Sequence, residues 1–512
     1  MKRKANSVAV ATTSQLAADA AEETAELGGN AVDCGIAAAM CSINTQPGVC
    51  ALAGSAYVTV WPADGEPVTI DGNVAIPGRG MPEGRTPEHE SVTIDYGGGV
   101  TTLVGASSVA VPGTLRALFL ASQRYGSLPW SVLMQPSIRA ARDGFPFPQA
   151  CHYYLSIAAG VIYDRSDDGF GAIHDAAGRL LDVGSTVIVP HLADSLAVIA
   201  EEGERALYDG DLGKTIVDHV QSRGGQLTME DLRSYQPDVH EALQVDIGDW
   251  RIATNPPPAI GGVNLAAMLL CFGTDPFDEW NGAQLQRLVD TQRAVMSYRR
   301  ACLDRADDVF EPARRMLELA RDGDLVPPGT SGSTVHTSAV DDAGTGCAIT
   351  ASSGYGSGEM PAGTGLWLNN CLGELELNYY GLEAGPPGKR LPSNMAPGCA
   401  RSGRAVVAIG SPGADRITTA LHQFLVNFMQ RGLDLDEAVA HPRLHLAIDV
   451  THEEIAVEPG IDLPDSGVQV RLYDDLNMYF GGVVAAKYDD VDGFDAAADP
   501  RREGGTTTGP AR

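Results

Sequence analysis

The sequence predicts a layered α/β sandwich, in which helices cover the outer faces of stacked β-sheets. Two observations support this fold class. Hairpin patterns occur in both halves of the chain, at residues 56–72 and 334–352, and helical patterns lie between and beyond them. The 512 residues, of which 44% are hydrophobic and 20% charged, are enough for a large α/β body with a packed core.

The N-terminal region predicts two helices. Apolar residues recur at helical spacing from Leu16 to Leu27, and Gly28 with Gly29 ends this first helix. Asn30 is a suitable N-cap for the second helix. Because the second helix is rich in Ala and Gly, we expect it to pack closely against a sheet.

The next elements are a hairpin and a series of helices. In the pattern over residues 56–72, two alternating strands meet at the turn Asp64–Gly65. Residues 105–235 are mainly helical in pattern. A proline-rich turn leads into an apolar helix over residues 254–272, and charged helical patterns occupy residues 284–321.

The character of the chain changes at residues 322–333, a polar linker of Pro, Gly and Ser. The second hairpin follows at residues 334–352, with the turn sequence DDAG. Residues 404–432 predict a strand, a tight glycine turn and a long helix. In the tail after residue 500 we expect disorder at the end.

Charge and composition exclude several classes of partner. The net charge of −30 repels phosphate, so nucleic acid and anionic lipid surfaces are excluded. No apolar run reaches the ~18–20 residues of a membrane span. The basic start MKRKANSVAVATTS lacks the apolar core of a secretory signal, so we expect a soluble, cytoplasmic protein. The nine cysteines form no CxxC pair, so neither a disulfide framework nor a zinc site is suggested. We expect no metal and no cofactor.

Thr334 is a candidate nucleophile at the start of the second hairpin. A Thr hydroxyl needs an adjacent base, and a free α-amino group on the same residue, with an ordinary pKa of about 7.7–8.0, would supply one. That amine exists only if the Ser333–Thr334 peptide is broken. The linker upstream and the strand downstream suit such a break. On this stretch alone, however, a plain polar loop is the stronger interpretation.

Spaced motifs run through nearly the whole chain in a fixed order. They are GGNAVDCGIAAA, VAVPGTLRALFLASQRYGSLPW, ARDGFPF, PPPAIGG, TVHTSAVDDAG, GTGLWLNN, RLPSNMAP and GSPGADRI. In this order they resemble the γ-glutamyltranspeptidase family of N-terminal-nucleophile hydrolases. The resemblance implies a four-layer αββα sandwich. It also implies a precursor that cleaves itself before Thr334, leaving chains 1–333 and 334–512 associated in one body.

The resemblance also implies roles for individual residues. Thr334 matches the nucleophile, and its freed amine matches the base. Ser352 stands where the family has a second Thr whose hydroxyl supports the nucleophile. Gly413 and Ala414 match a Gly-Gly pair whose backbone N–H groups form the oxyanion hole, and Ala keeps its N–H if the backbone angle is tolerable.

The substrate-recognition residues of the family carry over only in part. Asn73 falls at the position of an Arg that clamps a substrate carboxylate, and a neutral amide cannot replace a bidentate guanidinium. Arg79, six residues on, could substitute only if its loop folds back. The segment TASSGYGSG is about two residues shorter than its counterpart, with Gly354 or a neighbour where an Asn is expected. The other substrate-binding candidates are Cys371 in place of a Gln, Glu374 in place of an ammonium-binding Asp, Ser393 as a retained hydroxyl, and Asn394 in place of a second hydroxyl.

Three histidines are considered as candidates for a chemical role. His336 lies two residues beyond Thr334 on a strand, and therefore on the same face, but the expected mechanism already has its base, so we expect a structural histidine. His441 and His445 are four residues apart, which on a helix is metal-ligand spacing. No third ligand is evident, so a structural role is expected for both.

Three functions remain open at this point. The first is a self-processing hydrolase or acyltransferase that acts on a γ-glutamyl or related small amide. The second is a biosynthetic homologue, as in alkylproline antibiotic pathways, that cleaves a carbon–carbon or non-glutamyl bond. The third is an unprocessed, catalytically silent binding protein. In each case the expected partner is a small amide or an amino-acid-derived molecule, with dimerisation of the processed body as a further expectation.

Overall fold

The structure is a computed structural model that describes residues 7–82, 88–95, 99–304, 306, 308–325, 334–448, 453–464 and 466–510. A seven-stranded antiparallel sheet lies at its centre. Every neighbouring pair in this sheet is antiparallel. The strand order is β20 (Gly505–Pro510), β1 (Ser7–Thr12), β11 (Val335–Asp341), β12 (Gly346–Ser352), β2 (Ser55–Trp61), β3 (Val68–Gly72) and β8 (Asp238–Glu241).

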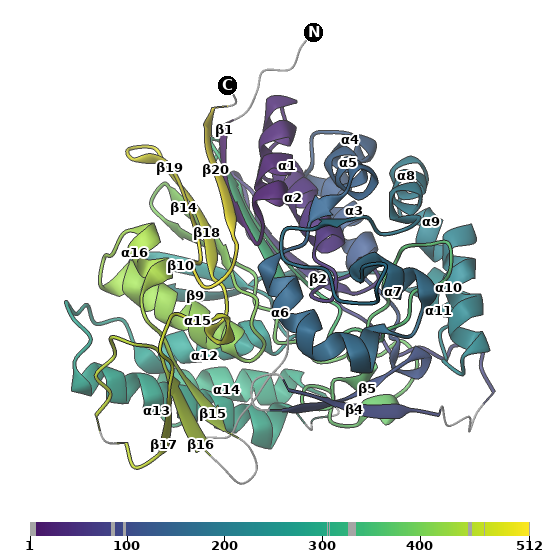
Figure 1. The fold of residues 1–512 in the computed structure, drawn as a ribbon. Helices are drawn as coiled ribbons and strands as arrows, with labels where there is room; N and C mark the ends of the chain where they lie inside the picture. Colours follow the sequence, from purple (N-terminus) through teal and green to yellow (C-terminus); the bar gives the residue numbers. More distant parts are fainter. Residues whose placement is uncertain are drawn as a thin grey trace.

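A second, six-stranded antiparallel sheet packs face to face on the first. Strands β1, β11 and β12 contact β14, β18 and β19 across the interface. Figure 1 shows β1 and β20 of the first sheet beside β14, β18 and β19 of the second. Small side chains such as Ala9, Ala348, Ala408 and Ala486 fill the space between the sheets and let them approach closely. The strand order is β19 (Gly493–Ala498), β18 (Val484–Asp489), β14 (Ala405–Gly410), β13 (Gly398–Ser402), β10 (Trp250–Thr254) and β9 (Leu243–Ile247).

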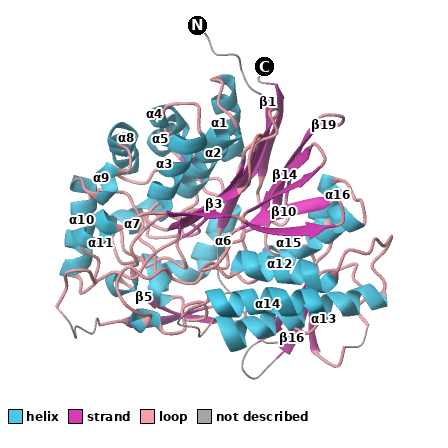
Figure 2. Ribbon diagram, turned by 180° about the vertical axis from the view of Figure 1, so that it is seen from behind, coloured by secondary structure: helices cyan, strands magenta, loops and turns pink. Residues whose placement is uncertain are grey.

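Helices cover the outer faces of both sheets, and Figure 2 shows the strands between the two helical groups. The first sheet is covered by α1 (Gln15–Glu26), α2 (Ala31–Thr45) and α3 (Thr114–Tyr125). The second is covered by α12 (Gly261–Phe272), α15 (Arg416–Leu425) and α16 (Leu435–Ala440). The four layers confirm the predicted αββα sandwich.

The remaining elements extend the helical layers. Beside α3 lie α4 (Trp130–Leu133), α5 (Gln135–Asp143), α6 (Gln149–Ala158), α7 (Asp167–Ile173), α8 (Leu192–Glu202), α9 (Arg205–Tyr208), α10 (Asp211–Ser222) and α11 (Met229–Ser234). Beyond α12 lie α13 (Gly282–Tyr298), α14 (Phe310–Asp322), β15 (Leu444–Ile448), β16 (Glu453–Val457) and β17 (Gln469–Leu472). A small hairpin pairs β4 (Glu90–Ile94) with β5 (Val100–Val104), and a short two-stranded sheet pairs β6 (Phe145–Pro146) with β7 (Thr186–Val187). Single 3₁₀ or π turns are η1 (Ala106–Ser108), η2 (Ala159–Tyr163), η3 (Arg299–Leu303), η4 (Cys371–Gly373), η5 (Gly381–Glu383), η6 (Val426–Gln430) and η7 (Met478–Phe480).

Most of the predicted elements are confirmed, and the tail is the exception. Both hairpins form, as β2–β3 and β11–β12, and Asn30 caps α2 with a capping box. The expectation of disorder in the tail was wrong for residues 505–510, because they pair with β1 as strand β20. The last two residues lie outside the described part.

The two segments separated by the predicted cleavage point are interleaved in both sheets. In the first sheet, β11 and β12 from the later segment lie between β1 and β2 from the earlier one. In the second sheet, β13 of the later segment pairs with β10 of the earlier one. Neither segment contains a complete sheet, so each depends on the other for its core.

His336 lies between the two sheets and has a structural environment. Its Nδ1 lies 2.7 Å from Thr350 Oγ1, and its Nε2 lies 2.9 Å from Ser338 Oγ. Burial lowers the pKa of His336 to about 3, so the ring is neutral at physiological pH. On the opposite sheet, Gly410 leaves room for the ring, because a β-carbon at that position would overlap the imidazole.

We therefore expect Gly410→Ala to destabilise the sandwich. The added methyl group has to displace His336 or separate the sheets, which should lower the free energy of unfolding by about 2 kcal/mol or more. The measurement is chemical unfolding followed by circular dichroism. The matched control is Gly171→Ala in α7, where an added β-carbon meets no atom within 4 Å. Equal stability of the two variants would contradict the close packing at His336.

Candidate active site

A row of polar side chains crosses four strands at one end of the first sheet. Thr334 immediately precedes β11, and continuing the β11–β12 register places it opposite Ser352. Ser352 pairs with Ser55 on β2, and the β2–β3 register then continues to Asn73. Directly paired residues of antiparallel strands share a face, so the four side chains lie on the same face of the sheet.

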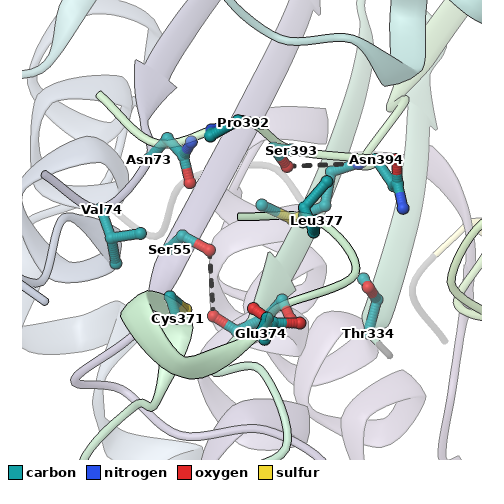
Figure 3. A pocket seen from close by; sticks show the side chains of 12 residues that line it. Ser55, Asn73, Val74, Thr334, Cys371, Glu374, Leu377, Pro392, Ser393 and Asn394 are labelled. Atoms are coloured by element: carbon teal, nitrogen blue, oxygen red, sulfur yellow. Dashed lines mark hydrogen bonds between the residues drawn. The ribbon is translucent and has the colours of Figure 1, made fainter. Parts of the chain in front are cut away.

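These four residues line a common cavity of about 30 Å³, which is enough room for a water molecule. Figure 3 shows side chains around it from both predicted segments. The structure thus brings together seven of the predicted site residues, and it adds Ser55, which sequence reasoning missed. The lining residues are Ser55, Asn73, Val74, Thr334, Ser352, Cys371, Glu374, Leu377, Pro392, Ser393, Asn394 and Met395.

Ser55 binds the backbone beside Ser352. Its Oγ donates a hydrogen bond to the carbonyl oxygen of Ser352 at 3.0 Å, and Ser352 Oγ accepts one from the N–H of Gly354 at 3.2 Å. A serine at the start of a predicted strand is an ordinary feature in a sequence. Only the register across β11, β12 and β2 shows that Ser55 belongs to the site.

Asn73 presents an acceptor to the cavity. Its Nδ2 donates to the carbonyl oxygen of Leu391 at 2.6 Å, which uses one of its two N–H groups and fixes the orientation of the amide. In Figure 3 the amide oxygen is on the side that faces Val74 and Ser55. An Arg at this position would present donors and a positive charge, whereas this oxygen suits a donor group of a ligand.

Arg79 does not replace the missing guanidinium, so the suggestion that its loop folds back to the site was wrong. Its backbone N–H donates to Asp231 at 3.0 Å, and its side chain lies against Gly388 in a different cavity. Arg390 is also engaged elsewhere, because it donates to the carbonyl oxygen of Asn73 at 3.1 Å and stacks on Tyr235. Among the described residues that line the Thr334 cavity, none is Arg, Lys or His.

Glu374 is a buried acid in this cavity. Burial raises its pKa to about 8, and the nearby carboxylate of Glu376 acts in the same direction. Gly354 has a φ of 69°, and a β-carbon there would lie 2.9 Å from Glu374 Oε2 and would overlap Asn370. The glycine therefore leaves the space that Glu374, which is longer than an Asp, occupies. Cys371, on η4, is buried beside it, and burial raises the pKa of the Cys371 thiol well above its usual range.

Ser393 and Asn394 lie on an extended segment that is anchored to the second sheet layer. The N–H groups of Ile260 and Gly261, at the start of α12, both donate to the carbonyl oxygen of Ser393 at 3.0 Å. A β-carbon on Gly261 would overlap Asn394, which explains the glycine in the PPPAIGG motif. The segment is thereby held over the Thr334 cavity.

Gly413 and Ala414, the predicted oxyanion-hole residues, form the turn between β14 and α15 and are not among the residues that line the Thr334 cavity. Both have positive φ, 125° and 78°, and this region disfavours a residue with a β-carbon such as Ala414. Burial acts to raise the pKa of the adjacent Asp415, but Arg416 and His445 hold it below its usual range. The contacts of Asp415 with Arg416 and His445 hold Asp415, the residue that follows Ala414, in place.

His441 and His445 do not share a helix face, because α16 ends at Ala440 and His445 lies on β15. His445 is structural: its Nδ1 lies 3.0 Å from Thr419 Oγ1, and its Nε2 lies 3.3 Å from Asp415. In the described part of the chain, no three His, Cys, Asp or Glu side chains are grouped as a metal site requires. Within the same residues, no helix is both long and apolar enough to span a membrane.

Comparison with known proteins places these features in a protein class. The fold matches the crystal structure of cephalosporin acylase from Bacillus halodurans with a TM-score of 0.79, at 24% identity over 98% of this chain and 96% of that one. This likeness, together with the αββα layers, defines an N-terminal-nucleophile hydrolase fold.

A family model described as Gamma-glutamyltranspeptidase matches residues 17–509, so the chain belongs to the gamma-glutamyltranspeptidase family. The glutathione hydrolase proenzyme of Pseudomonas aeruginosa is 28% identical over 97% of this chain and 93% of its own length. The acylase ACY 1 proenzyme of Pseudomonas sp. (strain V22) is 29% identical over 88% of this chain and 85% of its own. The family thus includes relatives named both as glutathione hydrolases and as acylases.

The raised pKa of Glu374 predicts a pH dependence of stability. Between the ordinary value of 4.5 and about 8, the folded chain holds a proton that the unfolded chain has released. The free energy of unfolding therefore falls as pH rises through this window. Glu374→Gln should flatten the fall, as measured by urea unfolding at pH 5, 6.5 and 8. The control is the exposed Glu201→Gln on α8. A slope in Glu374→Gln equal to that of the parent chain and of the control would contradict the assignment.

Proposed function

We propose that the protein is a self-processing amidohydrolase or acyltransferase with Thr334 as its nucleophile. The observation that carries the proposal is the row Thr334, Ser352, Ser55 and Asn73, which opens into one cavity at the start of β11. Membership of a family whose relatives are named as proenzymes supports the processing step. Ser333, the other side of the proposed break, lies outside the described residues.

The proposed chemistry uses the amine that cleavage creates. The α-amine of Thr334 accepts the hydroxyl proton as Oγ attacks the carbonyl carbon of the substrate amide. The tetrahedral intermediate collapses to an ester on Thr334, and the amine product leaves with the proton. Water or a second amine then attacks the ester and regenerates the hydroxyl. Ser352 orients the nucleophile, and the N–H groups of Gly413 and Ala414 are the proposed oxyanion donors.

The substrate preference follows from the charges at the site. Since no described cation lines the Thr334 cavity, an α-carboxylate on the acyl group would lack an ionic partner. Asn73 offers an acceptor instead, and an ammonium bound beside Glu374 would favour its ionised carboxylate over the protonated acid, so the two side chains suit an ammonium or another donor group. We therefore propose a small amide whose acyl group carries a donor but no carboxylate.

The biosynthetic alternative uses the same attack with a different leaving group. Carbon–carbon cleavage would start from Thr334 Oγ and a ketone carbonyl, and a stabilised carbanion would leave. The uncharged clamp at Asn73 is compatible with it, because such a substrate need not carry a γ-glutamyl carboxylate. Assays with simple amides separate these two functions, because turnover of such amides supports the amidohydrolase or acyltransferase.

One prediction of this proposed function concerns the self-cleavage of the chain. The purified protein should separate under denaturing conditions into fragments 1–333 and 334–512, and intact-mass spectrometry should place the break before Thr334. Thr334→Ala should remain one chain, because it has no hydroxyl to attack the preceding carbonyl. The matched control is Thr337→Ala on the same strand, which should still be cleaved. An unbroken parent chain would contradict the proposed function.

Another prediction of this function concerns the acyl group of the substrate. It is tested with three p-nitroanilides that differ only in their acyl group. The 4-aminobutyryl compound keeps the amine of a γ-glutamyl group but lacks the α-carboxylate, and the glutaryl compound keeps the carboxylate but lacks the amine. We expect the highest kcat/KM for 4-aminobutyryl, with γ-glutamyl lower by about 10-fold or more, because each unpaired charge-assisted bond costs roughly 1.5–3 kcal/mol. The glutaryl compound should be the poorest. A γ-glutamyl preference would refute the proposed charge preference.

A further inference from the structure

A second, much larger cavity adjoins the Thr334 cavity. Its volume is about 350 Å³, within the range of about 300–1,000 Å³ typical of small-molecule sites. Pro392 lines both cavities, and the same two segments form walls of each. Leu377 faces the smaller cavity while Asn378 and Tyr379 face the larger, and the segment that ends at Pro392 passes from the larger cavity into the smaller.

Three exposed aromatic side chains gather at this larger cavity. Phe310, Tyr379 and Tyr380 are 54%, 55% and 49% exposed, and all three line it. The two tyrosine rings pack edge to face with centroids 5.4 Å apart. Large aromatic groups left exposed around a concave site indicate an apolar ligand, because they gain free energy when a ligand removes them from water.

Three charged groups at the larger cavity are in ion pairs within the protein. Asp304 binds Arg299 at 2.9 Å, and Asp238 binds Arg390 at 3.2 Å. Asp308 accepts a hydrogen bond from the backbone N–H of Phe310 at 2.9 Å, and Lys389 Nζ donates to the carbonyl oxygen of Ala384 at 3.5 Å. The aromatic part of the cavity is therefore suited to an apolar group.

We infer that the larger cavity, named here the tyrosine cavity, binds the amine portion of the substrate amide, and that this portion is aromatic or alkyl. The inference rests on the proposed function, in which the acyl group lies against Asn73 and Glu374 beside Thr334. The tyrosine cavity continues from the Thr334 cavity at Pro392, so a substrate held at Thr334 can extend into it. When Thr334 Oγ bonds to the carbonyl carbon, the C–N bond breaks and the amine takes the proton from the α-amine of Thr334. It then leaves through the tyrosine cavity.

A binding experiment tests the site without turnover. The probe is 7-amino-4-methylcoumarin, an aromatic amine whose fluorescence anisotropy reports binding to the purified full chain. We expect saturable binding that p-toluidine, an uncharged aromatic amine, displaces and the small, uncharged formamide does not. In the double variant Tyr379→Ala/Tyr380→Ala the Kd should rise at least about 10-fold. The control Tyr153→Ala removes an exposed tyrosine from α6 and should leave the Kd unchanged.

The outcomes separate this inference from the proposed function. An unchanged Kd in the double variant, with an unchanged melting temperature, overturns the inference whether or not the chain processes itself. A raised Kd in a chain that never cleaves supports the cavity as a binding site and removes the proposed function instead.

A kinetic comparison then decides which half of the substrate the cavity holds. Two amides share the 4-aminobutyryl group, one with the aminocoumarin as its amine and one with methylamine. The double variant should lower kcat/KM for the coumarin amide at least about 10-fold relative to the methylamide. An equal loss for both amides would place the shared acyl group in the tyrosine cavity and overturn the inference.

Discussion

The position of β11 in the first sheet is the constraint on which the rest of the site depends. This strand pairs with β1 on one side and β12 on the other, and both pairings are long and antiparallel. A slip of one residue in either pairing would turn its side chains to the opposite face. Thr334, next to the first residue of β11, is therefore held at one place on one face of the sheet. The same strand register places the hydroxyls of Ser352 and Ser55 on that face, in the row that begins at Thr334.

Buried polar groups keep the two sheets and their covering elements in place around this strand. His336 bridges Thr350 and Ser338 as a neutral ring between the sheets. Farther away, Asp499 binds Arg443 at 2.7 Å and Arg501 at 3.0 Å in a fully buried ionic cluster. Burying charges is costly unless each one is paired, and breaking such a cluster leaves an uncompensated charge. The cluster thus specifies how the end of β19 joins the loops around β15.

Buried, paired charges also hold the strained turn at Ala414. A residue with a β-carbon in the left-handed region costs roughly 1–2 kcal/mol, so the surrounding structure has to impose this conformation. The next two residues, Asp415 and Arg416, are buried, pair with each other at 2.7 Å, and are joined by His445. A backbone that is fixed before substrate arrives is what oxyanion binding requires, which gives the proposed role of this turn a physical basis.

The side chains around the Thr334 cavity fit one another closely. Gly354 has no side chain to collide with Glu374. Asn73 donates from its amide nitrogen to the carbonyl oxygen of Leu391. The result is a compact polar cavity next to a broad aromatic one.

The local sequence determined the hairpins, the α2 cap and the glycine turns, because turn chemistry and periodicity act over a few residues. It also identified most of the cavity residues through ordered motifs. Only the tertiary structure decided that Ser55 joins the site, that Arg79 does not, that residues 505–510 form a strand, and that His445 lies on a strand and not on a helix with His441. Those outcomes depend on pairing register and on contacts between residues hundreds of positions apart, which local sequence patterns do not encode.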